Sequence, residues 1–254
     1  MWDNAPLLRN IANTLMAFSV FSVLYGAAYY VVHLPELFPL HSVHLATAPQ
    51  RVAAPEVLQV VRNEVRGNFF TVDIERIRQS LEQLPWVRSV SIRREFPDRL
   101  VVQLEEHQAL ARWNGNALVN QQGEMFSASS EQELPNFIGQ EGNSTEVAQY
   151  YTQFSRQLAA LDLQVVQLTQ TPRHAWQLQL SNGMVLELGR ELMQQRLATF
   201  VTVYPYSLAA MQGEVQREGG GNEDVHPSVN TSQVKYVDLR YRNGFAVQLR
   251  HGNA

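Results

Sequence analysis

The sequence contains no cysteine among its 254 residues. It therefore forms no disulfide, offers no thiolate ligand or catalytic thiol, and carries no lipid on a cysteine. Its seven histidines are scattered, and the HExxH, GxSxG and phosphate-loop motifs are all missing. The net charge is −4, whereas a nucleic-acid-binding domain needs a basic surface. We therefore expect no catalytic site, no metal, no cofactor and no nucleic-acid partner. In particular, no set of residues in the sequence supports a hydrolase.

Charge is also missing from one long segment near the N-terminus. No Asp, Glu, Lys or Arg lies between Arg9 and Glu36, and 17 of the 22 residues in 11–32 are apolar. As a helix, this segment would be roughly 33 Å long, enough to cross a hydrocarbon core of about 30 Å. A buried core helix or a cleavable signal peptide is the alternative, but the apolar run is longer than is typical of either. The segment predicts a single transmembrane helix.

The positions of the cationic residues predict its orientation. Arg9 and the terminal amine precede the apolar segment, and the next Arg or Lys after it is Arg51. Because positive charge is retained on the cytosolic side, we expect a cytosolic N-terminus and about 220 residues outside. The expected organisation is a cytoplasmic tail (1–10), a transmembrane helix (11–32), a Pro-stiffened linker (33–39), a first domain (40–106) and a second domain (107–254).

The first domain reads as strand, helix, helix, strand, strand. A short alternating run at 41–46 is followed by a helix that starts near Pro55 and by a second helix capped by Asp73. Alternating strands then flank the turn Phe96-Pro97-Asp98. Two helices on a three-stranded sheet form an α+β unit.

The second domain is marked by three Asn-Gly dipeptides, at 114–115, 182–183 and 243–244. Each lies between strand-like runs, and Asn-Gly supplies the two positive φ angles of a tight hairpin turn. Helices are expected at 147–161 and at 191–204, where Pro205 follows. We therefore expect an antiparallel sheet with packed helices, plus a mobile loop at 212–232, which has almost nothing to bury.

The last hairpin is the candidate for binding. It runs from Tyr236 and ends shortly before the C-terminus, at Arg250. A last strand often lies at a sheet edge, where its free backbone groups need protection or a partner strand. An ordinary covered strand remains the alternative from the pattern alone.

Several uncommon strings resemble the FtsQ family of bitopic bacterial cell-division proteins. They are Leu84-Pro85-Trp86-Val87, Phe96-Pro97-Asp98, Ala111-Arg112-Trp113-Asn114, Trp176-Gln177-Leu178, Leu188-Gly189-Arg190, Arg196-Leu197 and the run from Tyr236 to Tyr241. The resemblance implies a POTRA domain (β-α-α-β-β) at 40–106 and the family's β domain at 107–254. It also implies an inner-membrane protein with a periplasmic body.

The resemblance further implies a scaffold of the division machinery, the divisome, and not an enzyme. Such a scaffold links early and late division proteins through a complex with FtsB and FtsL, and FtsB adds a strand to the last strand of the β domain. The POTRA domain would contact other division proteins. The implied partner-binding residues are Arg190, Arg240, Tyr241, Asn243, Gly244, Phe245, Val247 and Leu249. The alternative function is a periplasmic POTRA-type module in outer-membrane protein transport, which would call for repeated POTRA units or a membrane barrel.

Overall fold

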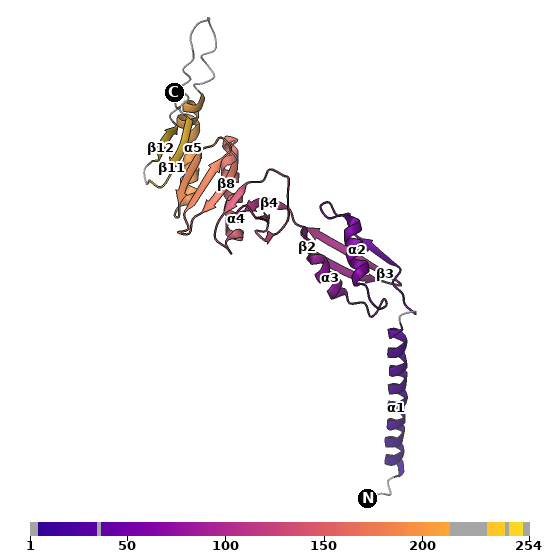
Figure 1. Cartoon of the computed structure of the whole chain (residues 1–254). Helices are drawn as coiled ribbons and strands as arrows, with labels where there is room; N and C mark the ends of the chain where they lie inside the picture. Colours follow the sequence, from indigo (N-terminus) through magenta and orange to yellow (C-terminus); the bar gives the residue numbers. More distant parts are fainter. Residues whose placement is uncertain (1–4, 35–36, 214–232, 242–243, 251–254) are drawn as a thin grey trace, which may run out of the picture. The chain divides into compact units, whose positions relative to one another are not determined.

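The computed structural model describes residues 5–34, 37–213, 233–241 and 244–250. The chain divides into two compact units, Met1–His107 and Gln108–Ala254 (Figure 1). The division lies one residue beyond the predicted domain boundary at 106/107. The loop expected at 212–232 falls almost entirely outside the described residues.

The N-terminal helix α1 runs from Ala5 to His33. Its span Pro6–His33 is long and apolar enough to cross a membrane, and none of it is buried inside the structure. Large apolar side chains such as Met16 and Phe21 are exposed along it. A buried core helix is therefore excluded. The helix also begins earlier than the predicted segment 11–32 and includes residues 5–10 of the predicted cytoplasmic tail.

The first unit has the predicted β-α-α-β-β order. In the described residues its sheet has three strands in the order β1-β3-β2, with β1 parallel and β2 antiparallel to β3. Asp73 caps α3 as predicted, because its carboxylate accepts a hydrogen bond from the backbone N–H of Arg76 (3.0 Å). The elements are β1 (Ser42–Leu45), α2 (Ala54–Glu64), α3 (Ile74–Glu82), β2 (Val87–Glu95) and β3 (Arg99–Glu106).

The second unit is built on one large sheet. Its described strands number nine, in the order β12-β11-β10-β9-β8-β7-β4-β5-β6. The strands are β4 (Ala109–Trp113), β5 (Ala117–Asn120), β6 (Met125–Phe126), β7 (Asn136–Ile138), β8 (Val165–Gln170), β9 (Trp176–Leu180), β10 (Val185–Gly189), β11 (Gln233–Asp238) and β12 (Ala246–Arg250). The helices are α4 (Ser144–Leu158), the short η1 (Ala159–Leu161) and α5 (Met193–Gly213).

The α+β class is confirmed, but the prediction of an antiparallel sheet in the second unit is wrong. The pairs β4–β7, β7–β8 and β10–β11 are parallel. Two of these pairs are joined through a helix: α4 connects β7 to β8, and α5 lies between β10 and β11. A helical crossover returns the chain in the same direction, so the strands it joins pair in parallel. The sheet is therefore mixed.

The Asn-Gly turns differ from one another. Asn114 (φ 48°) and Gly115 (φ 78°) both have positive φ, as predicted. In the second turn only the glycine does so, because a three-residue loop ends on Gly183 at φ 83°. The third dipeptide includes Asn243, which lies outside the described residues; the last described pair of that hairpin joins Asp238 with Ala246.

Helix α5 continues past the point where it was expected to end. Pro205 lies inside it, and the helix extends to Gly213. Proline removes one backbone N–H donor and so breaks one hydrogen bond of the helix, but the turns on either side can continue. Proline therefore marked a weakened turn and not the end of the helix.

One core holds the second unit together. Helix α4 packs on β8, α5 packs on β10 and β11, and the two helices contact each other, so they cover the same face of the sheet. Leu178, Leu186 and Phe200 are completely buried between the sheet and the helices. Alternate residues such as Gln177 and Glu187 lie on the opposite face and are partly exposed.

We expect Leu178→Ala to destabilise the second unit by about 2–5 kcal/mol, because it leaves a cavity in a packed core. The matched control is Leu192→Ala, whose side chain is exposed and which should cost under about 1 kcal/mol. Urea unfolding of the full chain, followed by tryptophan fluorescence, measures both. Equal unfolding midpoints for the two variants would contradict the assignment of Leu178 to the core.

Candidate functional site

Strand β12 lies at one end of the large sheet, as predicted for the last hairpin. It pairs antiparallel with β11, and no other described strand pairs with it. Val247 is opposite Val237, and Leu249 is opposite Val234. One edge of β12 is therefore open among the described residues.

The hydrogen bonds on the far side of β11 fix which backbone groups of β12 face that open edge. The N–H of Leu239 donates to the carbonyl of Glu187 on β10 (3.0 Å). Because backbone groups alternate sides along a strand, Val237 also faces β10, whereas Asp238 faces β12. Val247, opposite Val237, therefore directs its N–H and C=O away from β11. By the same alternation along β12, Leu249 does so too.

The side chains of the same two residues form a small apolar edge. Directly opposite residues in an antiparallel pair place their side chains on the same face. Val237 and Val234 are buried in the core, so Val247 and Leu249 point toward the helix-covered face. They remain 37% and 38% exposed, because no described strand lies beyond them. The edge thus offers both free backbone groups and uncovered apolar surface.

A charged network lies where β11 ends. The guanidinium of Arg240 donates to both carboxylate oxygens of Asp238, at 2.6 Å for the shortest contact. These hydrogen bonds hold the pKa of the Asp238 carboxyl below its usual value. On the neighbouring strand, burial raises the pKa of Glu187. The network folds the Arg240 side chain back onto the sheet and orders the segment that leads to Tyr241.

Arg196 connects this corner to α5. Its guanidinium donates to the carbonyl of Leu188 (2.5 Å) and reaches the carbonyl of Arg240 (3.5 Å). Gly189 lies in between at φ 72°, and a Cβ there would be 2.9 Å from the Arg196 guanidinium and 3.1 Å from the Arg240 side chain. The positive φ and the close approach of these two side chains both favour glycine at this position. No role was predicted from the sequence for Arg196 or Asp238, although both lie in strings singled out for their resemblance to a known family.

The structure brings most of the implied binding residues to one corner of the second unit. Arg190 follows Gly189 and is exposed beside Glu191, with 3.6 Å between their charged groups. Tyr241 is exposed, Gly244 is exposed and Phe245 packs partly on the core. Asn243 lies outside the described residues.

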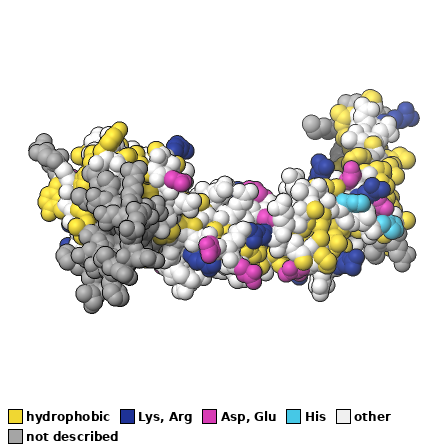
Figure 2. Space-filling model, turned by 90° about the horizontal axis from the view of Figure 1, so that it is seen from above, with side chains coloured by type: hydrophobic (Ala, Val, Ile, Leu, Met, Phe, Trp, Pro, Cys, Tyr) yellow, Lys and Arg dark blue, Asp and Glu magenta, His cyan; other side chains and the backbone are white. Residues whose placement is uncertain are grey.

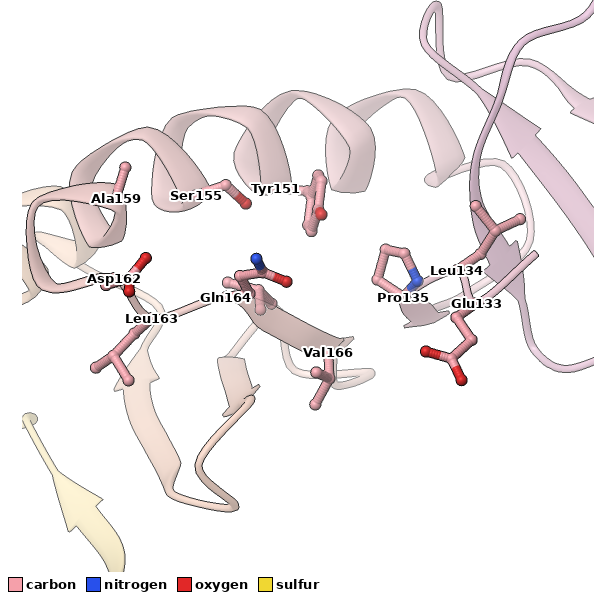
Figure 3. A pocket seen from close by; sticks show the side chains of 11 residues that line it. Glu133, Leu134, Pro135, Tyr151, Ser155, Ala159, Asp162, Leu163, Gln164 and Val166 are labelled. Carbon is pink, nitrogen blue, oxygen red and sulfur yellow. The ribbon is translucent and has the colours of Figure 1, made fainter.

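A hollow elsewhere in the second unit does not combine catalytic groups. It lies between α4 and the start of β8 and has a volume of about 390 Å³ (Figure 3). Tyr151 and Ser155 project into it from the helix, and Glu133 and Asp162 also line it. No histidine or lysine is among the described residues that line it, and the buried Ser155 hydroxyl has no hydrogen-bond partner that could act as its base.

The surface charge is mixed. Figure 2 shows Lys and Arg side chains interspersed with Asp and Glu over the visible face, with no large area of one sign. Within the described residues, no group of three or more His, Asp or Glu side chains is arranged to hold a metal ion. The open edge of β12 and the corner beside it are therefore the features that remain as a candidate site.

Comparison with known proteins gives the family. Residues 111–240 match the profile of the C-terminal domain of cell division protein FtsQ/DivIB, and residues 38–107 match the FtsQ-type POTRA domain. The chain belongs to the FtsQ family. It is 36% identical to cell division protein FtsQ of Nitrosospira multiformis, over 98% of this chain and 99% of that protein.

Other FtsQ proteins are similarly related. FtsQ of Burkholderia pseudomallei is 35% identical over 98% of this chain and 94% of its own length. FtsQ of Escherichia coli is 37% identical over 71% of this chain and 62% of its own length. The FtsQ family consists of structural division proteins and is not a known enzyme family. The matched C-terminal profile ends at Arg240, before β12 begins.

We expect Asp238→Asn to lower stability by about 1 kcal/mol at pH 7, since Arg240 is exposed and its attraction to Asp238 is partly screened. A lowered pKa in the folded state stabilises the fold above the unfolded-state pKa, about 3.9. The difference from wild type should therefore shrink as the pH falls below about 4.

Urea unfolding between neutral and acidic pH measures this difference. Glu141→Gln, at an exposed carboxylate, is the control and should match wild type to within about 0.5 kcal/mol. A penalty for Asp238→Asn that did not change with pH would show that the ion pair is not its cause.

Proposed function

We propose that this FtsQ-family chain is a membrane-anchored scaffold of the bacterial division machinery. Helix α1 spans the inner membrane with the N-terminus in the cytosol, and the POTRA domain and the second unit lie in the periplasm. The exposed apolar surface of α1 supports the span, since only lipid or another helix could cover it. Arg9 before the apolar run supports the orientation.

The scaffold acts by binding FtsB and FtsL, and a segment of FtsB adds a strand to β12. The observation that carries this proposal is the open edge of β12, where Val247 and Leu249 direct their backbone groups outward. An added strand would satisfy those groups and cover the two half-exposed side chains. Main-chain hydrogen bonds would supply affinity, and the apolar side chains would supply register and specificity.

The corner beside β12 would provide the remaining contacts. Arg190 is exposed there and is the cation we assign to an acidic residue of the partner. Arg240, Tyr241, Asn243, Gly244 and Phe245 lie in or next to the connection from β11 to β12 and would border the added strand. The POTRA unit would recruit other division proteins and so link early and late members of the machinery.

Replacing Val247 by proline tests strand addition directly. The N–H that it removes points to the open edge, so the bonds of β12 to β11, which belong to Ala246 and Gln248, are retained. We expect a fold like that of wild type by circular dichroism, and binding to purified FtsB–FtsL at least about tenfold weaker, since a hydrogen bond is lost and the ring obstructs the added strand.

Val247→Thr is the matched control, because it keeps the N–H and the β-branched shape. It should lose much less affinity than Val247→Pro. If Val247→Pro folds and binds the complex as wild type does, the partner does not add a strand at this edge.

Tyr241→Ala tests the aromatic contact at the same site. Tyr241 is 61% exposed, and truncation of an aromatic anchor at an interface typically costs about 2 kcal/mol, a loss of roughly 30-fold in affinity. Tyr206→Ala is the control, since Tyr206 is 86% exposed on α5. Titration by biolayer interferometry should separate the two variants; the same affinity for both would place Tyr241 outside the interface.

A further inference from the structure

The C-terminal end of α1 is fastened to the first folded unit by one buried side chain. The amide nitrogen of Asn68 donates to the carbonyls of Val32 (2.7 Å) and Leu34 (3.0 Å). Asn68 is completely buried, and its amide oxygen accepts hydrogen bonds from the backbone of Phe70 and Thr71. These bonds satisfy carbonyls that a helix end leaves unpaired. The loop at 68–71 is therefore fixed against the end of the apolar helix.

Aromatic side chains gather at this end of the unit. The rings of Phe38, Phe69, Phe70 and Phe96 contact one another edge to face, with centroids 5.0–6.3 Å apart. Phe70 and Phe96 are nevertheless 44% and 77% exposed, and Leu37, which precedes Phe38 in the sequence, is also exposed. We call Leu37, Phe38, Phe69, Phe70 and Phe96 the aromatic rim.

Hydrogen bonds hold the parts of the aromatic rim together. The N–H of Phe69 donates to the carbonyl of Phe38 (2.8 Å), and the guanidinium of Arg94 donates to the carbonyl of Phe69 (2.8 Å). Phe96 lies in the turn between β2 and β3. The N–H of His41, the residue before β1, donates a hydrogen bond to the carbonyl of Asp98 in this turn (3.1 Å). The rim is thus a fixed surface and not a set of independent side chains.

The depth of the rim follows from its connection to α1. The Asn68 side chain is hydrogen-bonded to the carbonyl of Val32, the last residue of the apolar run. Phe70 is two residues further along the chain, and two residues span at most about 7 Å. Amphipathic elements bury their apolar faces roughly 5–10 Å into the boundary between headgroups and acyl chains. If α1 crosses the membrane, the exposed rings therefore lie at the level of the headgroups.

We propose that the aromatic rim inserts into the outer-leaflet interface of the bilayer that α1 spans, and so docks the POTRA unit on the lipid surface. This inference rests on the proposed function for the membrane span of α1, but not on the binding of FtsB. Docking covers the two exposed phenylalanines and adds a second membrane contact to the single helix. It also fixes the orientation of the POTRA unit toward partners that lie in the same membrane.

The absence of cysteine allows a direct test with single nitroxide labels on the full chain. The protein is placed in vesicles of phosphatidylethanolamine and phosphatidylglycerol, with the label on Phe96→Cys, on Gln83→Cys or on Val20→Cys. Gln83 is exposed and precedes β2 at the end opposite the turn that carries Phe96. Val20 is near the middle of the apolar segment and reports on the span itself.

We expect the label at 96 to collide more often with oxygen than with a water-soluble nickel chelate, as a label in lipid does, and the label at 83 to show the reverse. Adding Leu37→Ser and Phe70→Ser to the 96 reporter should raise its collisions with the chelate several-fold toward the value at 83. That second variant keeps the reporter in place and tests the rim itself.

Three results would overturn the proposal. A label at 96 that is as accessible to water as the label at 83, with the label at 20 in lipid, refutes docking and leaves the membrane span intact. Labels at 96 and 20 that are both in water refute the span as well. Spin–spin broadening at 96 that disappears on dilution with unlabelled protein would assign the rim to a second copy of this chain.

Discussion

The open backbone edge of β12 is the constraint on which the proposed activity depends. A strand at the end of a sheet leaves half of its N–H and C=O groups without a partner strand, and water or another chain must satisfy them. In this chain the groups belong to Val247 and Leu249, because Ala246 and Gln248 face β11. The order of the sheet creates this edge: β11 pairs in parallel with β10, so the hairpin that follows can only extend the sheet outward.

Local sequence patterns predicted which helices and strands form better than they predicted which of them pair or contact one another. The cap by Asp73 and the turn at Asn114 depend on residues within one turn of the chain, and both were correct. The parallel pairing of β10 with β11 depends on a crossover of more than forty residues, which no local pattern reveals. The position of Arg196 was missed for the same reason, since its contact with the carbonyl of Arg240 spans 44 residues.

In the proposed scaffold the two units contribute to binding in different ways. Helix α1 and the aromatic rim would restrict where the molecule lies, whereas β12 and the corner at Arg190 and Arg240 would supply the contact. Partners confined to the same membrane meet such an edge at a high effective concentration, so moderate affinity is sufficient. Because strand addition uses main-chain groups, its affinity depends less on side-chain identity than a side-chain interface does. The ion pair between the buried Asp238 and the exposed Arg240 lies next to the connection that leads to β12.

The most direct test of strand addition is amide hydrogen exchange along β12, measured by NMR on the full chain with and without the FtsB–FtsL complex. In the free protein the amides of Ala246 and Gln248 should be protected by β11, and those of Val247 and Leu249 should exchange rapidly. Binding should protect Val247 and Leu249 and leave the other two almost unchanged. Rapid exchange at Val247 and Leu249 in the saturated complex would contradict the account.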